Sequence, residues 1–222
     1  MKYSVIIPTL NEEANLHRQL LYFNKIKADV EIIVSDGGST DGSLELLKNS
    51  NFIVCTGEAG RGVQLNRGAG MAEGEILIFL HADTFLPYNA FEIIDSYFLN
   101  KDIKAATFSL KFDVNNLLLN FYTKFTKLNF LFTNFGDSSI VIRKDFFEHL
   151  GMFPDFKIME DVEFLRRVRK YTKIRILPAH VVTSSRRFLK KGIIKTQLLS
   201  ALYLTQYFLG RPPDKIYEKY YS

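Results

Sequence analysis

The sequence predicts an α/β fold in which a mostly parallel sheet is flanked by helices. Short, nearly unbroken apolar runs, typical of strands buried on both faces, alternate with segments of helical periodicity in the first half of the chain. Polar and acidic residues directly follow several of these runs, and open α/β sheets bind ligands at the carboxyl ends of their strands. No repeat, low-complexity segment or linker divides the chain, so we expect one domain over residues 1–222.

Six apolar runs are expected to form the strands, at residues 3–7, 31–35, 52–55, 76–80, 105–112 and 138–142. The helix after the first run begins near Asn11, and the helix after the second has Ser39 or Thr40 as its capping residue. A glycine-rich connection then enters a third helix at residues 62–71. This order of strands and helices predicts repeated β-α-β units.

The second half of the chain contains a short helix, expected at residues 145–149 and ended by Gly151, and two longer helical patterns. Leucine and phenylalanine residues recur at helical spacing over residues 117–135. We interpret this stripe as core packing, and a platform for a hydrophobic acceptor or a membrane is the alternative. Residues 193–210 carry a second apolar stripe, formed by Ile194, Leu198, Leu202 and Leu209. This amphipathic helix is expected to pack on the protein body, with a membrane surface as the alternative.

The composition is that of an ordinary globular protein, with 47% hydrophobic and 24% charged residues. A net charge of +5 suits an anionic ligand such as a nucleotide diphosphate or an anionic membrane surface, and it equally suits a mildly basic soluble protein. No signal-peptide pattern precedes the first strand, and no run approaches the roughly 20 apolar residues of a spanning helix. We expect a cytoplasmic protein with no nucleic-acid partner, and peripheral contact with the inner face of the membrane is the alternative.

Polar residues that follow the first two expected strands are candidates for binding a nucleoside. Pro8, Thr9, Asn11 and Glu12 follow the first strand, and Asp36 follows the second. Asn11 could instead cap a helix, and Asp36 could belong to a plain turn. Their shared position at successive strand ends favours a binding function.

A glycine-rich segment at residues 60–70 is a second candidate site. Its small residues let the backbone approach a ligand closely, and Arg61 adds a fixed positive charge near Gln64. The segment lacks the glycine and lysine spacing of a P-loop and the G-x-G-x-x-G of a dinucleotide site. Those two nucleotide-binding classes are therefore excluded.

Three further segments carry charged groups suited to group transfer. His81-Ala82-Asp83 ends the fourth strand, and one carboxylate can hold a hard divalent cation together with substrate phosphates. Glu160-Asp161 begins a helical pattern, where acids are also favourable for purely electrostatic reasons. Arg186-Arg187 suits phosphate geometry, and a solvated basic turn is the alternative.

Taken in order, these segments resemble the nucleotide-sugar-dependent glycosyltransferases of family 2, which have the Rossmann-like GT-A fold. One small bacterial branch, often labelled arsenosugar-biosynthesis glycosyltransferases, is similar in His81-Ala82-Asp83-Thr84, Gly136-Asp137, Met159-Glu160-Asp161-Val162 and Ser184-Ser185-Arg186-Arg187. The resemblance covers nearly the whole chain. It implies a nucleotide-sugar-binding half at about residues 1–112 and an acceptor-side half with the amphipathic helix at about 113–222.

The resemblance implies donor-side roles for the first group of candidates. The loop at residues 8–12 cradles the ribose, Asp36 approaches the base, and the helix start at Arg61 lies near the base and diphosphate. Asp83 holds Mg²⁺ or Mn²⁺, while His81 replaces the first acid of the family's D-x-D metal motif and contacts the nucleotide instead. The expected donor is a UDP-sugar.

On the acceptor side, the resemblance makes Asp161 the general base that accepts the proton of the attacking hydroxyl, with Glu160 orienting it. Arg186 and Arg187 stabilise the departing diphosphate, and Gly136-Asp137 lines the acceptor pocket. Direct displacement inverts the anomeric carbon. The acceptor is not identified, and a lipid-linked acceptor and a homo-oligomer stay open.

Two other functional classes remain at this stage. A nucleotidyltransferase has a related architecture, but its usual glycine-rich opening signature is absent. A sugar-nucleotide-binding protein with weakened catalysis is the second, because the metal motif has only one acid.

Overall fold

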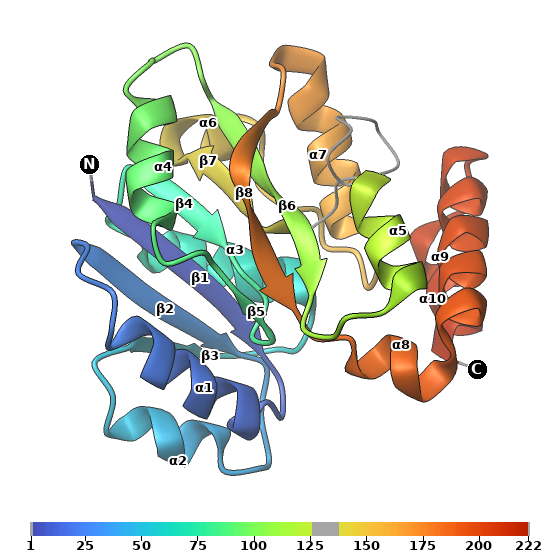
Figure 1. The fold of residues 1–222 in the computed structure, drawn as a ribbon, viewed down its shortest axis with the longest axis horizontal. Helices are drawn as coiled ribbons and strands as arrows, with labels where there is room; N and C mark the ends of the chain where they lie inside the picture. Colours follow the sequence, from blue (N-terminus) through green and yellow to red (C-terminus); the bar gives the residue numbers. More distant parts are fainter. Residues whose placement is uncertain (1, 126–137, 222) are drawn as a thin grey trace.

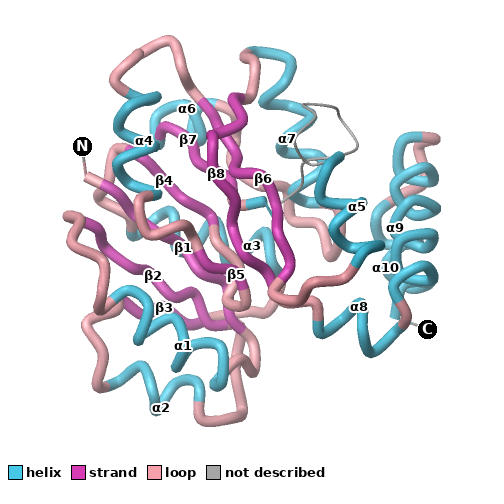
Figure 2. The backbone as a smooth tube through the Cα atoms, viewed as in Figure 1, coloured by secondary structure: helices cyan, strands magenta, loops and turns pink. Residues whose placement is uncertain are grey.

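The computed structural model describes residues 2–125 and 138–221. Over these residues the chain forms one sheet with helices packed on both of its faces (Figures 1 and 2). The strand order is β3-β2-β1-β4-β7-β6-β8-β5. The strands of this part of the chain are β1 (Tyr3–Thr9), β2 (Val30–Asp36), β3 (Ile53–Thr56), β4 (Ile76–Phe79), β5 (Thr84–Phe85), β6 (Ala105–Phe112), β7 (Ile140–Arg143) and β8 (Arg175–Thr183).

The first four strands run parallel and end at one edge of the sheet. β1 pairs with β2 and β4, and β2 pairs with β3. The last residue of β1, Thr9, therefore lies opposite Asp36 at the end of β2. Beyond β4 the sheet is mixed, because β7 runs antiparallel to β4 and β6, whereas β8 is parallel to β6. The predicted parallel order thus holds for the half of the sheet that carries the nucleoside candidates.

Alternating side chains of the central strands separate the core into two clusters. Val5 and Ile7 of β1 join one cluster with α1 (Glu13–Phe23) and α4 (Ala90–Phe98). Ile6, between them, joins the other cluster with α3 (Arg61–Met71) and α7 (Glu160–Tyr171). The remaining described helices are α2 (Ser43–Lys48), α5 (Leu117–Phe125), α6 (Lys144–His149), α8 (Arg186–Lys191), α9 (Ile193–Phe208) and α10 (Pro213–Tyr221).

The helix after β2 does not have the predicted cap. α2 begins after Gly42, and neither Ser39 nor Thr40 caps it. Ser39 Oγ instead accepts a hydrogen bond from the Asn11 N–H at 2.8 Å, and the Thr40 N–H donates to Asn11 Oδ1 at 2.8 Å. The loop after β1 thus binds these residues before the helix begins. Gly151, by contrast, ends α6 as predicted, with a φ of +79°.

Two predicted helical stripes differ from the expected packing. α5 covers the beginning of the stripe at residues 117–135, and residues 126–137 lie outside the described part. On α5, Leu119 is fully buried but Phe121 is 61% exposed, so only one side of the helix packs in the core. Helix α9 packs on the protein body through Tyr203 and Leu204. The predicted stripe is not the packed side, because its four residues are exposed, namely Ile194, Leu198, Leu202 and Leu209. Within the described residues, no helix has both the length and the apolar character needed to cross a bilayer.

Candidate active site

The loops after β1 and β2 hold each other at the carboxyl edge of the sheet. Asn11, at a left-handed φ of +54°, accepts the Thr40 N–H with its side-chain oxygen. Asp36 is fully buried, and its Oδ1 accepts the N–H groups of Gly38 and Ser39 at 2.8 Å each. Asn11 and Asp36 therefore stabilise the conformation of these two loops. Direct contact of Asp36 with a base stays a prediction.

Two side chains of α3 fasten this helix to the same loops. Gln64 donates to the carbonyl oxygens of Thr9 and Ser35 at 2.8 Å each, which uses both of its amide protons. Arg67 donates to the Asp36 carbonyl at 2.9 Å and to the Glu58 carbonyl at 2.7 Å. Gln64, predicted to bind the nucleotide, thus acts within the protein as a positioning residue. Arg67, which we did not predict, does the same.

The segment after β4 is held from two sides. The buried Gln19 of α1 donates to the Ala82 carbonyl at 2.9 Å and to the Thr84 carbonyl at 2.8 Å. The hydroxyls of Thr84 and Thr183 lie 2.9 Å apart. Asp83 is half-buried between these fixed points and lines a cavity of about 360 Å³ with His81, and its role as a metal ligand stays a prediction.

Glu160 and Asp161 begin α7 and share one arginine. Arg61 Nε donates to Glu160 Oε1, and Arg61 Nη2 lies 3.4 Å from Asp161 Oδ1. Asp161 Oδ1 also accepts the Val162 N–H at 2.8 Å. Arg61 begins α3, so this contact joins the two regions that the sequence placed on the donor and acceptor sides.

Burial sets the electrostatics of this pair. The Glu160 side chain is 1% exposed, and its Oε2 has no hydrogen-bond partner among the described residues. Burial raises the pKa of the Glu160 carboxyl above its ordinary value of 4.5; Arg61 opposes this rise, and the neighbouring Asp161 adds to it. Arg61 therefore offsets part of the cost of burying the Glu160 carboxylate.

The start of α7 fits closely against α3. A Cβ atom on Gly62 would lie 2.7 Å from the Pro154 carbonyl oxygen and 3.3 Å from Glu160 Cβ. Met159, directly before the two acids, has a left-handed φ of +68°, a conformation that costs a non-glycine residue about 1–3 kcal/mol. The glycine thus permits the approach that brings Arg61 to the acids.

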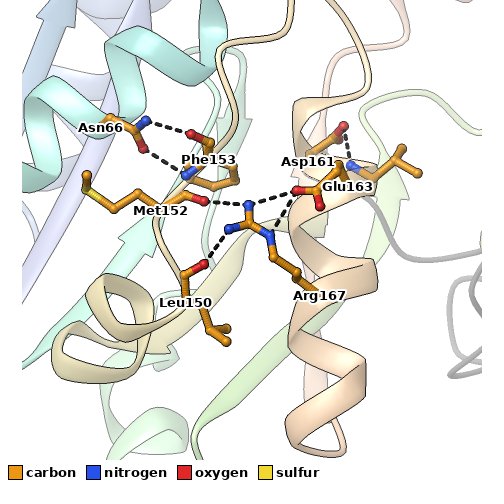
Figure 3. Close-up of polar contacts among 8 residues, drawn as sticks. Asn66, Leu150, Met152, Phe153, Asp161, Glu163 and Arg167 are labelled. Carbon is orange, nitrogen blue, oxygen red and sulfur yellow. Dashed lines mark hydrogen bonds and ion pairs between the residues drawn. The ribbon is translucent and has the colours of Figure 1, made fainter. Parts of the chain in front are cut away.

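The loop before α7 is fixed by two polar side chains (Figure 3). Arg167 of α7 donates to the Leu150 carbonyl and, at 2.7 Å, to the Met152 carbonyl, while Glu163 binds its guanidinium. Asn66 of α3 exchanges two hydrogen bonds with the Phe153 backbone, at 2.9 and 3.0 Å. These residues were not predicted, because bonds to backbone groups leave no pattern in the sequence.

One of the two acids, the metal candidate and two arginines line adjoining cavities. The cavity of about 360 Å³ with His81 and Asp83 also has Arg61 and Arg187 in its wall. A second cavity of about 510 Å³ has Arg61, Arg187 and Asp161 in its wall. Arg186 points elsewhere, 3.8 Å from Glu12, and is exposed. Gly136 and Asp137, predicted for the acceptor side, lie outside the described residues.

The residues around Asp83 fit a hard divalent cation held mainly by its substrate. Its carboxylate is half-buried, faces a cavity, and accepts only the Thr84 hydroxyl, at 3.3 Å, among the interactions of described residues. No group of three or more His, Cys, Asp or Glu side chains suited to a metal occurs in the described part of the chain. One carboxylate plus phosphate oxygens is a common way to bind Mg²⁺.

Comparison with known proteins identifies the class of this site. The model of glycosyl transferase family 2 matches residues 4–151, which include the loops after β1, β2 and β4. The chain therefore belongs to glycosyl transferase family 2 and is a transferase. This membership removes the nucleotidyltransferase alternative. Glu160, Asp161 and the arginine pair lie beyond the matched segment.

Two curated relatives carry the description of uncharacterized glycosyltransferases. One, from Haemophilus influenzae, is 25% identical over 222 residues, covering 94% of this chain and 88% of the relative. The other, YfnE of Bacillus subtilis, is 37% identical over 91 residues, covering 37% of this chain and 23% of the relative.

Solved structures establish the GT-A fold. TarS 1–349 of S. aureus superimposes with a TM-score of 0.69 at 22% identity, covering 83% of this chain and 61% of that chain. Glucosyl-3-phosphoglycerate synthase of Mycobacterium tuberculosis gives a TM-score of 0.61 at 17% identity, covering 82% of this chain and 70% of that chain. At these identities the likeness concerns the fold alone.

Proposed function

We propose that this chain transfers a sugar from a nucleotide-diphosphate sugar, with UDP as the expected nucleotide, to an acceptor hydroxyl. The observation that carries this proposal is the convergence of Asp83, Arg61 and Asp161 on adjoining cavities at the carboxyl edge of the sheet. TarS is known in complex with UDP-GlcNAc, and the mycobacterial synthase in complex with UDP. These complexes support a donor of the same class.

A divalent cation, Mg²⁺ or Mn²⁺, is proposed at Asp83. When bound, it would neutralise charge on the donor diphosphate. The mycobacterial synthase with UDP and the Pyrobaculum calidifontis mannosyltransferase with GDP-Man both carry Mn²⁺, which supports this assignment. His81, in place of a second acid, leaves the cation dependent on the donor phosphates, so the site is expected to bind metal weakly without nucleotide.

The proposed chemistry assigns separate tasks to Asp161 and the arginines. The acceptor hydroxyl oxygen forms a bond to the anomeric carbon while its proton passes to Asp161. The bond from that carbon to the diphosphate oxygen breaks, and its electron pair leaves with the nucleoside diphosphate. Arg187 and Arg61 border the same hollow and stabilise that charge. Attack opposite the leaving group inverts the anomeric carbon.

Arg61 also provides a link between donor binding and the base. Its guanidinium is shared by Glu160 and Asp161 in the structure. A donor diphosphate competes with these carboxylates for the same group, because guanidinium binds phosphate and carboxylate with similar geometry. Movement of Arg61 toward the diphosphate would free Asp161 for the acceptor proton.

The acceptor and the cellular location are part of the same proposal. A cytoplasmic enzyme at the inner face of the membrane, acting on a lipid-linked acceptor, accords with the exposed apolar side of α9. The resemblance to the arsenosugar-labelled bacterial branch stays a proposal that rests on the motifs around Asp83 and Asp161.

Thermal unfolding in the presence of nucleoside diphosphates tests the donor. A ligand at one hundred times its Kd stabilises the folded chain by about 2.7 kcal/mol, which corresponds to a Tm increase of about 5–10 °C for a chain of this size. We expect this increase for UDP with Mn²⁺ and a smaller one for UDP alone. No increase with UDP, GDP, TDP or ADP, with or without metal, would contradict a nucleotide-sugar donor.

A further inference from the structure

Helix α9 packs on the protein through one side, which includes Tyr203 and Leu204, and presents a second apolar side to solvent. Ile194, Leu198 and Leu202, spaced four residues apart, are 60%, 66% and 50% exposed. Thr196 and Tyr203, on the opposite side, are buried. A helix that packs on a globular protein normally has polar residues on the side opposite the core. The exposed apolar side therefore needs a partner other than the described core.

Basic residues border this apolar side, and acidic residues are missing from the surrounding sequence. Lys190 and Lys191 end α8 and Lys195 lies in the first turn of α9, and all three are exposed. Leu189 on α8 adds a further exposed leucine. No Asp or Glu occurs in the sequence between Glu163 and Asp214. The partner is thus expected to be both apolar and anionic.

The inward side of the same helix lines the candidate active site. Gln197, Ser200 and Leu204 of α9 border the cavity of about 360 Å³ that contains Asp83. Phe188 of α8 borders it too and contacts Tyr122 of α5, with ring centroids 6.5 Å apart. In Figure 1, α5, α8 and α9 lie together at one end of the molecule. One helix, about 10–12 Å thick, thus separates the cavity from the apolar surface.

We propose that the outward side of α8 and α9, formed by Leu189, Ile194, Leu198, Leu202 and the three lysines, docks on an anionic membrane surface. The 16-residue α9 lies in the plane of the interface, with its leucines among the acyl chains and the lysines at the lipid headgroups. Docking places the active-site cavity directly behind the membrane contact, where a membrane-borne acceptor can reach it. A second copy of the chain fits less well, because a two-fold contact on this side brings identical lysine clusters together.

Vesicle sedimentation tests this docking without requiring turnover, so it is independent of the proposed transfer reaction. At low salt we expect binding to phosphatidylglycerol vesicles and little binding to phosphatidylcholine vesicles. Changing Leu198 and Leu202 to Gln is expected to weaken binding about tenfold per leucine. Changing Lys190, Lys191 and Lys195 to Gln is expected to weaken it about fivefold per lysine. Because these side chains are exposed, folding is expected to be unaffected, and circular dichroism checks this.

Leu99→Gln is the matched control. Leu99 is 77% exposed at the end of α4, which Figure 1 shows at the opposite end of the molecule from α9. This variant should bind vesicles like the original chain. Absence of binding to anionic vesicles, or an equal loss in Leu99→Gln, would overturn the proposal. The chain could instead form a dimer in solution that the Leu198 and Leu202 changes dissociate, and show no vesicle binding. That result would assign the surface to a second copy of the chain and overturn membrane docking.

Discussion

Replacement of Arg61 by Met should destabilise the chain in a pH-dependent way. Arg61 is the cation that binds Glu160, whose side chain is 1% exposed, and it also lies 3.4 Å from Asp161 Oδ1. Met keeps much of the side-chain volume but removes the charge. The variant therefore leaves two adjacent carboxylates at the start of α7 without this guanidinium.

The size of the effect follows from burial. Removing one partner of a buried ion pair typically costs about 3–5 kcal/mol. The Arg61 side chain is 35% exposed, so solvent screens part of this interaction. We therefore expect a loss of about 2 kcal/mol at pH 8, or a urea midpoint lowered by about 1 M for a slope of about 2 kcal/mol per M.

The pH dependence gives the sharper expectation. Burial raises the pKa of Glu160 above 4.5 in the folded chain, and loss of Arg61 raises it further. A raised folded-state pKa means that stability is fully present below the unfolded-state pKa and is lost as pH rises through the folded-state value. Protonation of one carboxyl costs about 1.4 kcal/mol per pH unit above its ordinary pKa. At pH 5.5, one unit above the ordinary pKa of 4.5, Glu160 can therefore lower the free energy of unfolding by at most about 1.4 kcal/mol.

Urea unfolding from pH 5.5 to 8 measures this dependence. The chain contains no Trp, so circular dichroism is the suitable signal. The deficit of Arg61→Met should grow with pH, and it should shrink when Glu160→Gln is added. Arg186→Met, which removes an exposed arginine 3.8 Å from Glu12, should change stability by at most about 0.5 kcal/mol. A deficit that does not vary with pH would refute the assigned role of Glu160.

Two further predictions concern the metal and the helix contact. Asp83→Ala should remove the Mn²⁺-dependent part of the thermal stabilisation by UDP and leave the metal-independent part, and an unchanged metal effect would exclude Asp83 as the ligand. Gly62→Ala should cost about 1–3 kcal/mol because its Cβ would lie 2.7 Å from the Pro154 carbonyl. Gly70→Ala, whose Cβ would meet no atom within 4 Å apart from the neighbouring backbone of its own helix, should instead stabilise α3 by about 0.5–1 kcal/mol. Similar urea midpoints for the two alanine variants would contradict the close contact of α3 with α7.

The sequence predicts the parallel half of the fold well because its strands are buried on both faces. Residues 76–80, for example, are a continuous apolar run, and β4 forms within them. β8 was missed because it alternates between buried and exposed residues and contains Pro178. The pairing of β8 with β6 is irregular between Thr107 and Ser109, opposite Ile176 and His180, and Pro178, which has no N–H to donate, lies in this gap.

The candidate site was predictable only in part. Asp83 was indicated by its place at the end of a strand, where open α/β sheets bind ligands. Glu160 and Asp161 were indicated by the resemblance of their segment to the family. The side chains that hold these segments, such as Gln19 and Arg67, bind backbone carbonyls that any residue supplies. The spacing of leucines on α9 predicted an apolar face but not its direction, because spacing does not indicate what covers a face.

The general base is tested most directly by Asp161→Asn, measured for nucleotide binding and for sugar transfer in the same preparation. Asn keeps nearly the same size and accepts the Val162 N–H, but it cannot take up a proton effectively. A general base contributes about 10²–10⁴-fold to rate, so transfer should fall by at least about a hundredfold, while UDP affinity should barely change. Near-normal transfer by the folded variant would eliminate Asp161 as the base, and a parallel loss of UDP binding would indicate a structural role.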